Sequence, residues 1–144
     1  MRAVWIAPLI AVAGAIGFGD AGYAQSVEFG KNGYLRSCVT CHGTTGKGDG
    51  PTAKSLKVPP ADLTKLAKSN KGVFPILRVY HVIDGRIEVL THGSRDMPVW
   101  GDVYKRELTH RAPPDLSMPK EMSEAMVHER ILALIEYIST LQEK

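Results

Sequence analysis

The chain has 144 residues, with a net charge of +3, 44% hydrophobic residues, 23% charged residues and two cysteines. This length suits one domain, and the balance of charged and hydrophobic residues excludes a globally disordered chain. Two cysteines exclude a disulfide-dense scaffold, and the small net charge gives no indication of a nucleic-acid partner.

The first 24 residues have the features of a secretory signal peptide. Arg2 is followed by 17 uncharged residues, and Gly22 and Ala24 form a small-x-small end. A basic start, a short apolar run and such an end are typical of cleaved leaders. The run is at the short limit of a membrane span and contains proline and glycine, so we expect cleavage and not a stable membrane anchor. The prediction is a leader over 1–24 and one folded domain over 25–144, exported to the periplasm.

A first helix is expected from about Val27 to Cys38. Gly30, Tyr34 and Cys38 recur every four residues and therefore share one face of this helix. Glycine within a helix costs about 1 kcal/mol relative to alanine, so Gly30 indicates close approach by another element. The C-terminal helix is the expected partner.

Cys38, Cys41 and His42 form a Cys-x-x-Cys-His motif at the end of that helix. On one helical turn, residues at i, i+3 and i+4 share a face. Two thiols at this spacing can bond to the two vinyl groups of a haem, and the adjacent imidazole can bind its iron. This is the c-type haem attachment interpretation of the motif.

Three other interpretations fit the pattern less well. A thioredoxin-like redox pair would lie near a βαβ pattern, and no strand-rich segment precedes Cys38. A structural zinc ion would need a second ligand pair at finger-like spacing, which the other histidines do not provide. A disulfide between Cys38 and Cys41 would be strained, because their Cβ atoms must approach within about 4.5 Å.

The next segments are a loop and two predicted helices. Gly43–Pro51 contains four glycines and suits packing against a flat cofactor. It lacks the Gly-Lys-Ser/Thr ending of a phosphate-binding loop. Asp62 is a candidate N-cap for a helix to about Ser69. A second helix is expected from about Phe74 to Asp84, with a proline in its first turn and a glycine after its end.

An electron-transfer haem needs a sixth iron ligand, and residues 86–101 are expected to carry it. Met97 lies among turn-forming residues, so a loop can present its thioether to the iron. His92 shares that loop and is the second choice. The other candidates are more simply explained as surface, neighbouring or core groups: His81, His110, His128, Met118, Met122 and Met126.

The C-terminal part is expected to end in an amphipathic helix. A short helix from Asp102 to about His110 and an irregular, proline-containing connection over 112–122 precede it. Ser123 is its candidate N-cap, and Met122 and Met126 are expected to fill gaps in the core. Its apolar positions recur at helical spacing: Val127, Ile131, Leu134, Ile135, Ile138 and Leu141.

The sequence stretches CVTCHG, GTTGKGDGP, PPADL and MPVWG, followed by this helix, resemble a bacterial class I c-type cytochrome over most of residues 26–144. The resemblance implies an all-α cytochrome c fold of three to five helices around one covalently bound haem c. It also implies that the terminal helices cross, with Gly30 and Tyr34 meeting Leu134 and Tyr137.

The same resemblance implies the roles of the site residues. Cys38 and Cys41 would form thioether bonds to the haem, and His42 and Met97 would be its axial ligands.

Three further residues follow from the resemblance. The carbonyl of Pro51 would accept a hydrogen bond from His42 and raise the basicity of its ring. Trp100 would pack beside the haem and donate to a propionate, although plain core filling also explains a tryptophan there. Pro98, next to the proposed ligand, would belong to the haem pocket.

The expected function is electron transport by a carrier that is not itself an enzyme. It would shuttle single electrons between redox partner proteins, as a monomer unless it is part of an enzyme complex. The alternative is a haem c subunit stably bound to a periplasmic dehydrogenase or oxidase. An exposed apolar patch would distinguish such a subunit, and residues 111–122 are the candidate segment for it. A haem-based sensor or enzyme with an open iron site would require that Met97 does not bind iron.

Charge is distributed unevenly along the chain. Residues 31–78 hold nine Lys and Arg against two Asp and Glu, whereas residues 79–144 hold eight against eleven. A basic region close to the haem could steer docking onto an acidic surface of a redox partner. A solvated lysine face explains the same imbalance.

Overall fold

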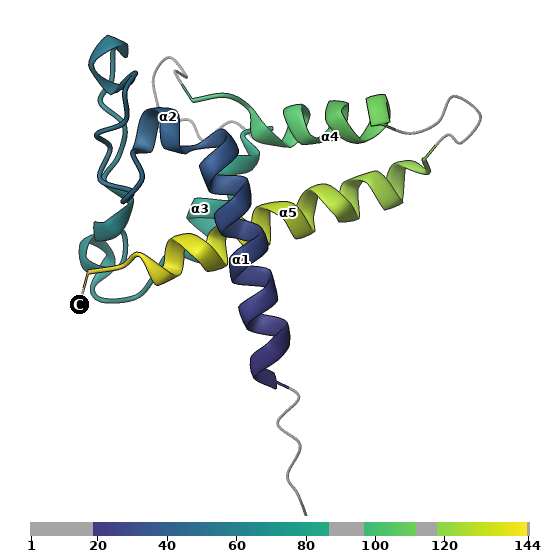
Figure 1. Ribbon diagram of the computed structural model, residues 1–144, viewed down its shortest axis with the longest axis horizontal. Coiled ribbons are helices and arrows are strands. Elements are labelled where there is room, and N and C mark those ends of the chain that lie inside the picture. Colours follow the sequence, from purple (N-terminus) through teal and green to yellow (C-terminus); the bar gives the residue numbers. More distant parts are fainter. Residues whose placement is uncertain (1–18, 87–96, 112–117, 144) are drawn as a thin grey trace, which may run out of the picture.

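The computed structural model describes residues 19–86, 97–111 and 118–143. Their α-helices are α1 (Gly19–Ser37), α2 (Val39–His42), α3 (Ile76–Asp84), α4 (Trp100–Arg111) and α5 (Lys120–Thr140). Three short 3-10 turns lie in the connection between α2 and α3 (Figure 1): η1 (Ala53–Ser55), η2 (Leu63–Lys65) and η3 (Lys68–Asn70). Across these three ranges the chain forms no strand, and the predicted all-α fold is confirmed.

The two terminal helices, α1 and α5, cross at the centre of the core (Figure 1). Tyr34 of α1 and Leu134 of α5 are almost fully inaccessible to solvent. The rings of Tyr34 and Tyr137 lie 5.3 Å apart between centroids, tilted by 55°. The predicted crossing and the contact between these two tyrosines are confirmed.

Gly30 allows α1 to approach the backbone of α5. A Cβ atom on Gly30 would collide with the carbonyl group of Ala133 and lie 3.1 Å from the backbone nitrogen of Leu134. At Gly33, a Cβ atom would meet the tip of the Leu134 side chain at 3.3 Å. The close approach predicted at Gly30 is confirmed, and it is a contact between two backbones.

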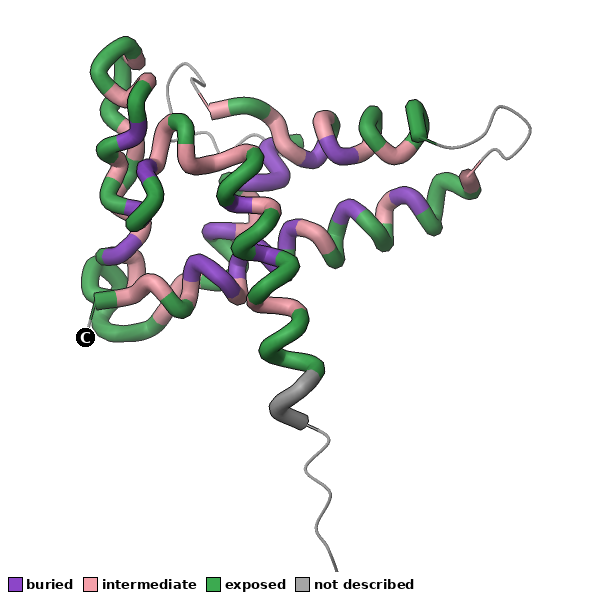
Figure 2. The backbone as a smooth tube through the Cα atoms, viewed as in Figure 1, coloured by how far each residue is buried: buried purple, intermediate pink, exposed green. Residues whose placement is uncertain are grey.

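The other long helices pack along α5. Val79 and Ile83 of α3 and Tyr104 of α4 belong to the same buried cluster. Figure 2 shows buried positions recurring along α5 and at its crossing with α1. The predicted apolar stripe of α5 is confirmed, with Leu141 partly buried and the others buried: Val127, Ile131, Leu134, Ile135 and Ile138.

The predicted start of α5 was wrong. The helix begins at Lys120, and its N-cap is Pro119. Ser123 is buried inside the helix, where its hydroxyl donates to the carbonyl of Lys120 at 2.8 Å, as serines within helices often do. Met122 and Met126 are 55% and 40% exposed, because each lies one residue, about 100° around the helix, from the buried row. They do not fill the core as predicted.

The helix predicted from Asp62 is replaced by the tight turns η2 and η3. Asp62 does act as a cap, since its carboxylate accepts from the backbone nitrogen and the hydroxyl of Thr64, at 3.0 and 2.5 Å. A bond from a side chain to a group two residues ahead favours a turn over a continuing helix. Lys71 then adopts a left-handed conformation with φ of 57°, which ends η3.

α3 begins at Ile76 and α4 at Trp100, each about two residues from its predicted start. The predicted start of the first helix at Val27 was wrong, because α1 begins at Gly19, within the predicted leader. Gly85 follows α3 with φ of 68°, as predicted for a glycine after a helix end. Residues 112–117 lie outside the described residues, and the rest of the expected irregular segment includes the first turn of α5.

The start of the predicted leader, residues 1–18, also lies outside the described residues, and its cleavage after Ala24 stays a prediction. Among the helices of the described ranges, none combines the length and the apolar character that crossing a membrane requires.

Candidate functional site

The Cys-x-x-Cys-His motif lies on the turn that joins α1 to α2. The backbone N–H of Cys38 donates to the carbonyl of Tyr34 at 2.8 Å, and that of His42 donates to the carbonyl of Cys38 at 2.9 Å. Helical hydrogen bonding therefore continues through the motif. Both thiols and the imidazole lie within this one turn, as a shared ligand requires.

Both thiols are half-buried and not joined by a disulfide. Burial and the neighbouring Cys41 raise the pKa of the Cys38 thiol to about 12. A protonated thiol is a poor nucleophile in disulfide exchange. The Sγ atom of Cys41 lies 3.3 Å from the Thr52 hydroxyl, which itself donates to the carbonyl of Thr40 at 2.9 Å.

The ring of His42 is held in one orientation by the backbone. Its Nδ1 atom donates to the carbonyl oxygen of Ala61 at 3.1 Å, which leaves Nε2 as the nitrogen with a free lone pair. Burial lowers the pKa of this imidazole, and the Ala61 carbonyl opposes that effect only in part. The neutral ring is the form that binds metals.

The prediction that Pro51 supplies this carbonyl was wrong, because Ala61 supplies it. The backbone nitrogens of Gly50 and Thr52, on either side of Pro51, donate to the carbonyls of Cys41 and Thr40 at 3.0 and 3.1 Å. These bonds hold the Pro51 segment along the backbone of the motif. The signal for Ala61 was its place in PPADL, a stretch that contributed to the family resemblance but in which only Asp62 was assigned a role.

Glycines let the loop after the motif fold back onto it. A Cβ atom on Gly50 would collide with the Thr40 carbonyl and lie 2.6 Å from the carbonyl carbon of Cys41. The hydroxyl of Tyr34, fully buried, donates to the carbonyl of Gly43 at 2.6 Å. This bond, which no motif in the sequence indicates, ties the start of the loop to the buried face of α1.

Met97, Pro98 and Trp100 lead into α4. Met97 is half-buried and packs against the buried cluster, which Cys38 also borders. Pro98 is exposed. The ring of Trp100 is half-buried and stacks on Tyr104, with 5.6 Å between centroids and 30° between planes. Packing against Tyr104 is therefore enough to explain a tryptophan at this position, as the core-filling interpretation expects.

The other candidate ligands are scattered. His92 lies outside the described residues. His110 is exposed on α4, and His128 is exposed on α5 with Nδ1 3.0 Å from the hydroxyl of Tyr80. The Nδ1 atom of His81 is buried, with no hydrogen-bond partner among the described residues. Nowhere in the described ranges do three His, Cys, Asp or Glu side chains gather as a metal cluster would need.

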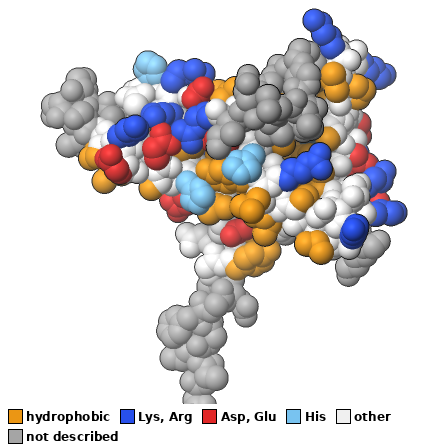
Figure 3. Space-filling model, turned by 180° about the vertical axis from the view of Figure 1, so that it is seen from behind, with side chains coloured by type: hydrophobic (Ala, Val, Ile, Leu, Met, Phe, Trp, Pro, Cys, Tyr) orange, Lys and Arg blue, Asp and Glu red, His pale blue; other side chains and the backbone are white. Residues whose placement is uncertain are grey.

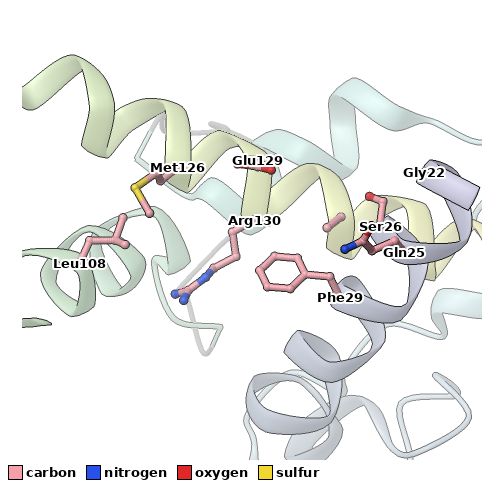
Figure 4. Close-up of a pocket in the computed structure, with 9 residues that line it drawn as sticks. Gly22, Gln25, Ser26, Phe29, Leu108, Met126, Glu129 and Arg130 are labelled. Atoms are coloured by element: carbon pink, nitrogen blue, oxygen red, sulfur yellow. The ribbon is translucent and has the colours of Figure 1, made fainter.

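A groove of about 480 Å³ opens between the start of α1, α4 and α5. Figure 4 shows the side chains of Phe29 and Arg130 in this groove, with Met126 and Leu108 farther along it. None of the residues that line it belongs to the predicted haem site. The candidate site is therefore the motif turn and the loop that folds over it.

The residues of that turn fit a covalently bound haem. Two unpaired thiols stand one helical turn apart, next to an imidazole whose Nε2 is free and whose Nδ1 is already committed. The loop that folds back on them has glycine at position 50, where a side chain would collide with the backbone of the motif. The donor set and its cover are those that c-type haem attachment needs.

An all-α chain with crossing terminal helices, and with this motif directly after the first of them, is a c-type cytochrome. The family described as "Cytochrome C oxidase, cbb3-type, subunit III" matches residues 25–110, and the chain belongs to it. No curated protein and no solved structure matches the chain. Membership in a cytochrome c family implies haem c as the cofactor and haem-based electron transfer, with redox proteins as partners.

Proposed function

We propose that the chain is a periplasmic electron-transfer protein that carries single electrons between redox partners through one covalently attached haem c. The observation that supports it is the motif turn, where two free thiols lie beside an imidazole held by the Ala61 carbonyl. When bound, the haem would supply an iron that alternates between the ferric and ferrous states.

Cys38 and Cys41 would attach the haem. Each S–H would add across one vinyl group, with sulfur bonding to one vinyl carbon and hydrogen to the other. This addition would consume no oxidant or reductant and needs two separate thiols; no disulfide joins Cys38 to Cys41.

His42 and Met97 would be the axial ligands. The Ala61 carbonyl fixes the ring of His42 and increases its basicity through Nδ1. Methionine and histidine together raise the reduction potential of a haem. Two protein ligands leave no iron position for a substrate, so this site serves a carrier and not an enzyme. Trp100 and Pro98 would border the haem on the Met97 side.

An optical and potentiometric titration of the purified holoprotein tests this assignment. The oxidised wild type should show the weak far-red band of a sulfur–iron bond. Met97→Ala should abolish the band and lower the potential, while His81→Ala, a control at the buried histidine without a partner, should keep both. A Met97→Ala protein with an unchanged band and potential would refute the ligand assignment. A wild type without the band would favour a sensor or enzyme with an open iron site.

Export of the chain is the second part of the proposal. Residues 1–24 would be removed as a leader, and 25–144 would fold as one domain around the haem. Mass spectrometry of protein from the periplasmic fraction should give an N-terminus at Gln25. An intact leader on membrane-bound protein would contradict it.

The second candidate function is that of a haem c subunit in a larger enzyme complex. The description of the matching family, an oxidase subunit, favours it. So do three strongly exposed apolar side chains at and before the start of α3, namely Val73, Ile76 and Leu77, exposed by 66%, 53% and 75%. Clusters of exposed apolar side chains commonly mark protein interfaces. Met122, in the segment predicted to carry such a patch, is also exposed.

The oligomeric state separates a free carrier from a bound subunit. Size-exclusion chromatography of natively expressed protein should give a monomer for a carrier and a larger complex for a subunit.

Hydrophobic side chains gather on the face shown in Figure 3, with Lys and Arg side chains beside them. If the basic region steers docking, electron transfer to the natural partner should slow steeply with ionic strength. A flat salt profile would contradict steering.

A further inference from the structure

An ion-pair network lies at both ends of the chain segment that carries Met97. Asp84, the last residue of α3, is only 4% exposed, and its carboxylate accepts from Nε of Arg86 at 2.9 Å. A terminal nitrogen of Arg86 donates to Glu124 of α5 at 2.6 Å, and Lys105 of α4 donates to the other oxygen of Glu124 at 2.6 Å. One guanidinium thus joins the end of α3 to α5, and Glu124 extends the link to α4.

Gly101 allows the first turn of α4 to pack directly against this network. It is buried, and a Cβ atom there would lie 2.5 Å from Nε of Arg86 and collide with the carboxylate of Asp84. Gly85, with φ of 68°, turns the chain so that Arg86 can fold back onto Asp84. The contact therefore depends on two glycines, Gly85 in the turn and Gly101 at the point where α4 packs against the ion pairs.

The ion pairs in this network stabilise the charged forms of Arg86 and Glu124. The bonds to Glu124 and Asp84 raise the pKa of Arg86. Lys105 first, and then Arg86, lower the pKa of Glu124 to about 2. A nearly inaccessible carboxylate such as Asp84 is costly without a partner. Of Asp84, Arg86 and Glu124 only Asp84 is buried, and an ion pair with an accessible partner adds little net stability. The consequence that matters here is therefore the geometry that the pairs fix.

That geometry brings together two residues on either side of the proposed ligand in the sequence. Arg86 and Gly101 are 15 residues apart in sequence but in contact, and Met97 lies four residues before Gly101. We propose that the contact of Asp84, Arg86 and Gly101, tied to α5 through Glu124, is a brace that positions Met97 for its bond to iron. Arg86 is then a positioning residue. This inference rests on the proposed function only in taking Met97 as the sixth ligand.

Competition by an added ligand measures how firmly Met97 is held. Exogenous imidazole binds iron only when Met97 has left it, so its apparent affinity rises with the fraction of open molecules. Loss of the brace frees both ends of the segment and increases that fraction. We expect imidazole to bind Arg86→Gln holoprotein about tenfold more tightly, which corresponds to about 1.4 kcal/mol.

A second ion pair on the same helices provides the matched control. Glu107 of α4 binds Arg130 of α5 at 2.8 Å, outside the brace. Glu107→Gln should therefore leave the imidazole affinity unchanged. Arg86→Lys should be intermediate, because one ammonium cannot reproduce the fork that reaches two carboxylates. The reduction potential should fall in Arg86→Gln and stay constant in Glu107→Gln.

The outcomes separate this inference from the proposed function. A wild type without the far-red band removes Met97 as ligand, and the brace proposal with it. A wild type with the band, together with equal imidazole affinities in Arg86→Gln and Glu107→Gln, overturns the brace alone. If Arg86→Gln does not retain haem, the milder variant Glu124→Gln tests the brace in its place, because it keeps the pair of Arg86 and Asp84. It should bind imidazole about threefold more tightly, and an unchanged affinity would overturn the brace.

Discussion

The crossing of α1 and α5 gives the sharpest test of the fold, at Gly30. Replacing Gly30 by alanine puts a methyl group into the carbonyl group of Ala133 and 3.1 Å from the backbone nitrogen of Leu134. Neither backbone atom can rotate away as a side chain can. The two helices must move apart at the point where Tyr34 and Tyr137 are in contact.

Two effects of opposite sign set the magnitude. Alanine gains about 1 kcal/mol over glycine within a helix, whereas overpacking a tight core contact costs about 1 to 3 kcal/mol or more. Because the collision is with backbone, the upper end of that cost applies, and we expect Gly30→Ala to lose about 2 kcal/mol net. For a domain of this size, that loss lowers Tm by roughly 8 °C.

Gly33 is the matched control on the same helix. A methyl group there meets the tip of the Leu134 side chain at 3.3 Å, which can give way. Gly33→Ala should therefore be neutral or gain up to about 1 kcal/mol from helix propensity. Urea denaturation of the holoproteins, followed by circular dichroism, gives the free energy of unfolding for both variants. Equal stabilities in Gly30→Ala and Gly33→Ala would refute the backbone contact.

Three further predictions concern the site and its surroundings. Tyr34→Phe removes the buried hydroxyl that binds the Gly43 carbonyl and should cost about 1 to 2 kcal/mol in urea denaturation; an unchanged midpoint would mean that this bond contributes nothing. Gly50→Ala places a methyl group against Cys41, so the yield of covalent haem, measured by pyridine haemochrome absorbance, should fall several-fold, and a normal yield would contradict the cover assigned to the loop. The ion pairs of Glu124 lower its pKa from 4.5 to about 2, so its contribution to stability is complete above pH 4.5 and lost as the pH falls toward 2. Glu124→Gln should flatten the pH dependence of stability in that window, and a curve as steep as that of the wild type would rule the contribution out.

Much of the fold follows from repeating patterns in the sequence. The spacing of apolar residues in α5 predicts its buried face, and Gly30 predicts a close approach to that helix, whereas the crossing itself was implied by the resemblance to c-type cytochromes. The errors lie at helix starts and in the connection between α2 and α3. At Ser123 the hydroxyl binds a carbonyl within the helix instead of capping it, a choice between two local bonds that the residue type alone leaves open. At Asp62 a strong local bond to Thr64 favours tight turns over a helix.

The sequence by itself determined the chemistry of this protein. Cys38, Cys41 and His42 are close enough in the chain that one helical turn fixes their arrangement, whatever the rest of the fold does. This is why the motif predicts a haem site without any knowledge of the tertiary structure.

Only the tertiary structure decided which groups hold that chemistry in place. The partner of His42 is the carbonyl of Ala61, 19 residues away. Every residue carries such a carbonyl, so no residue type marks the acceptor, and only the path of the chain selects it. The contact of Arg86 with Asp84 and Gly101 has the same origin, because a charge pair and a glycine acquire their meaning when folding brings α3 and α4 together.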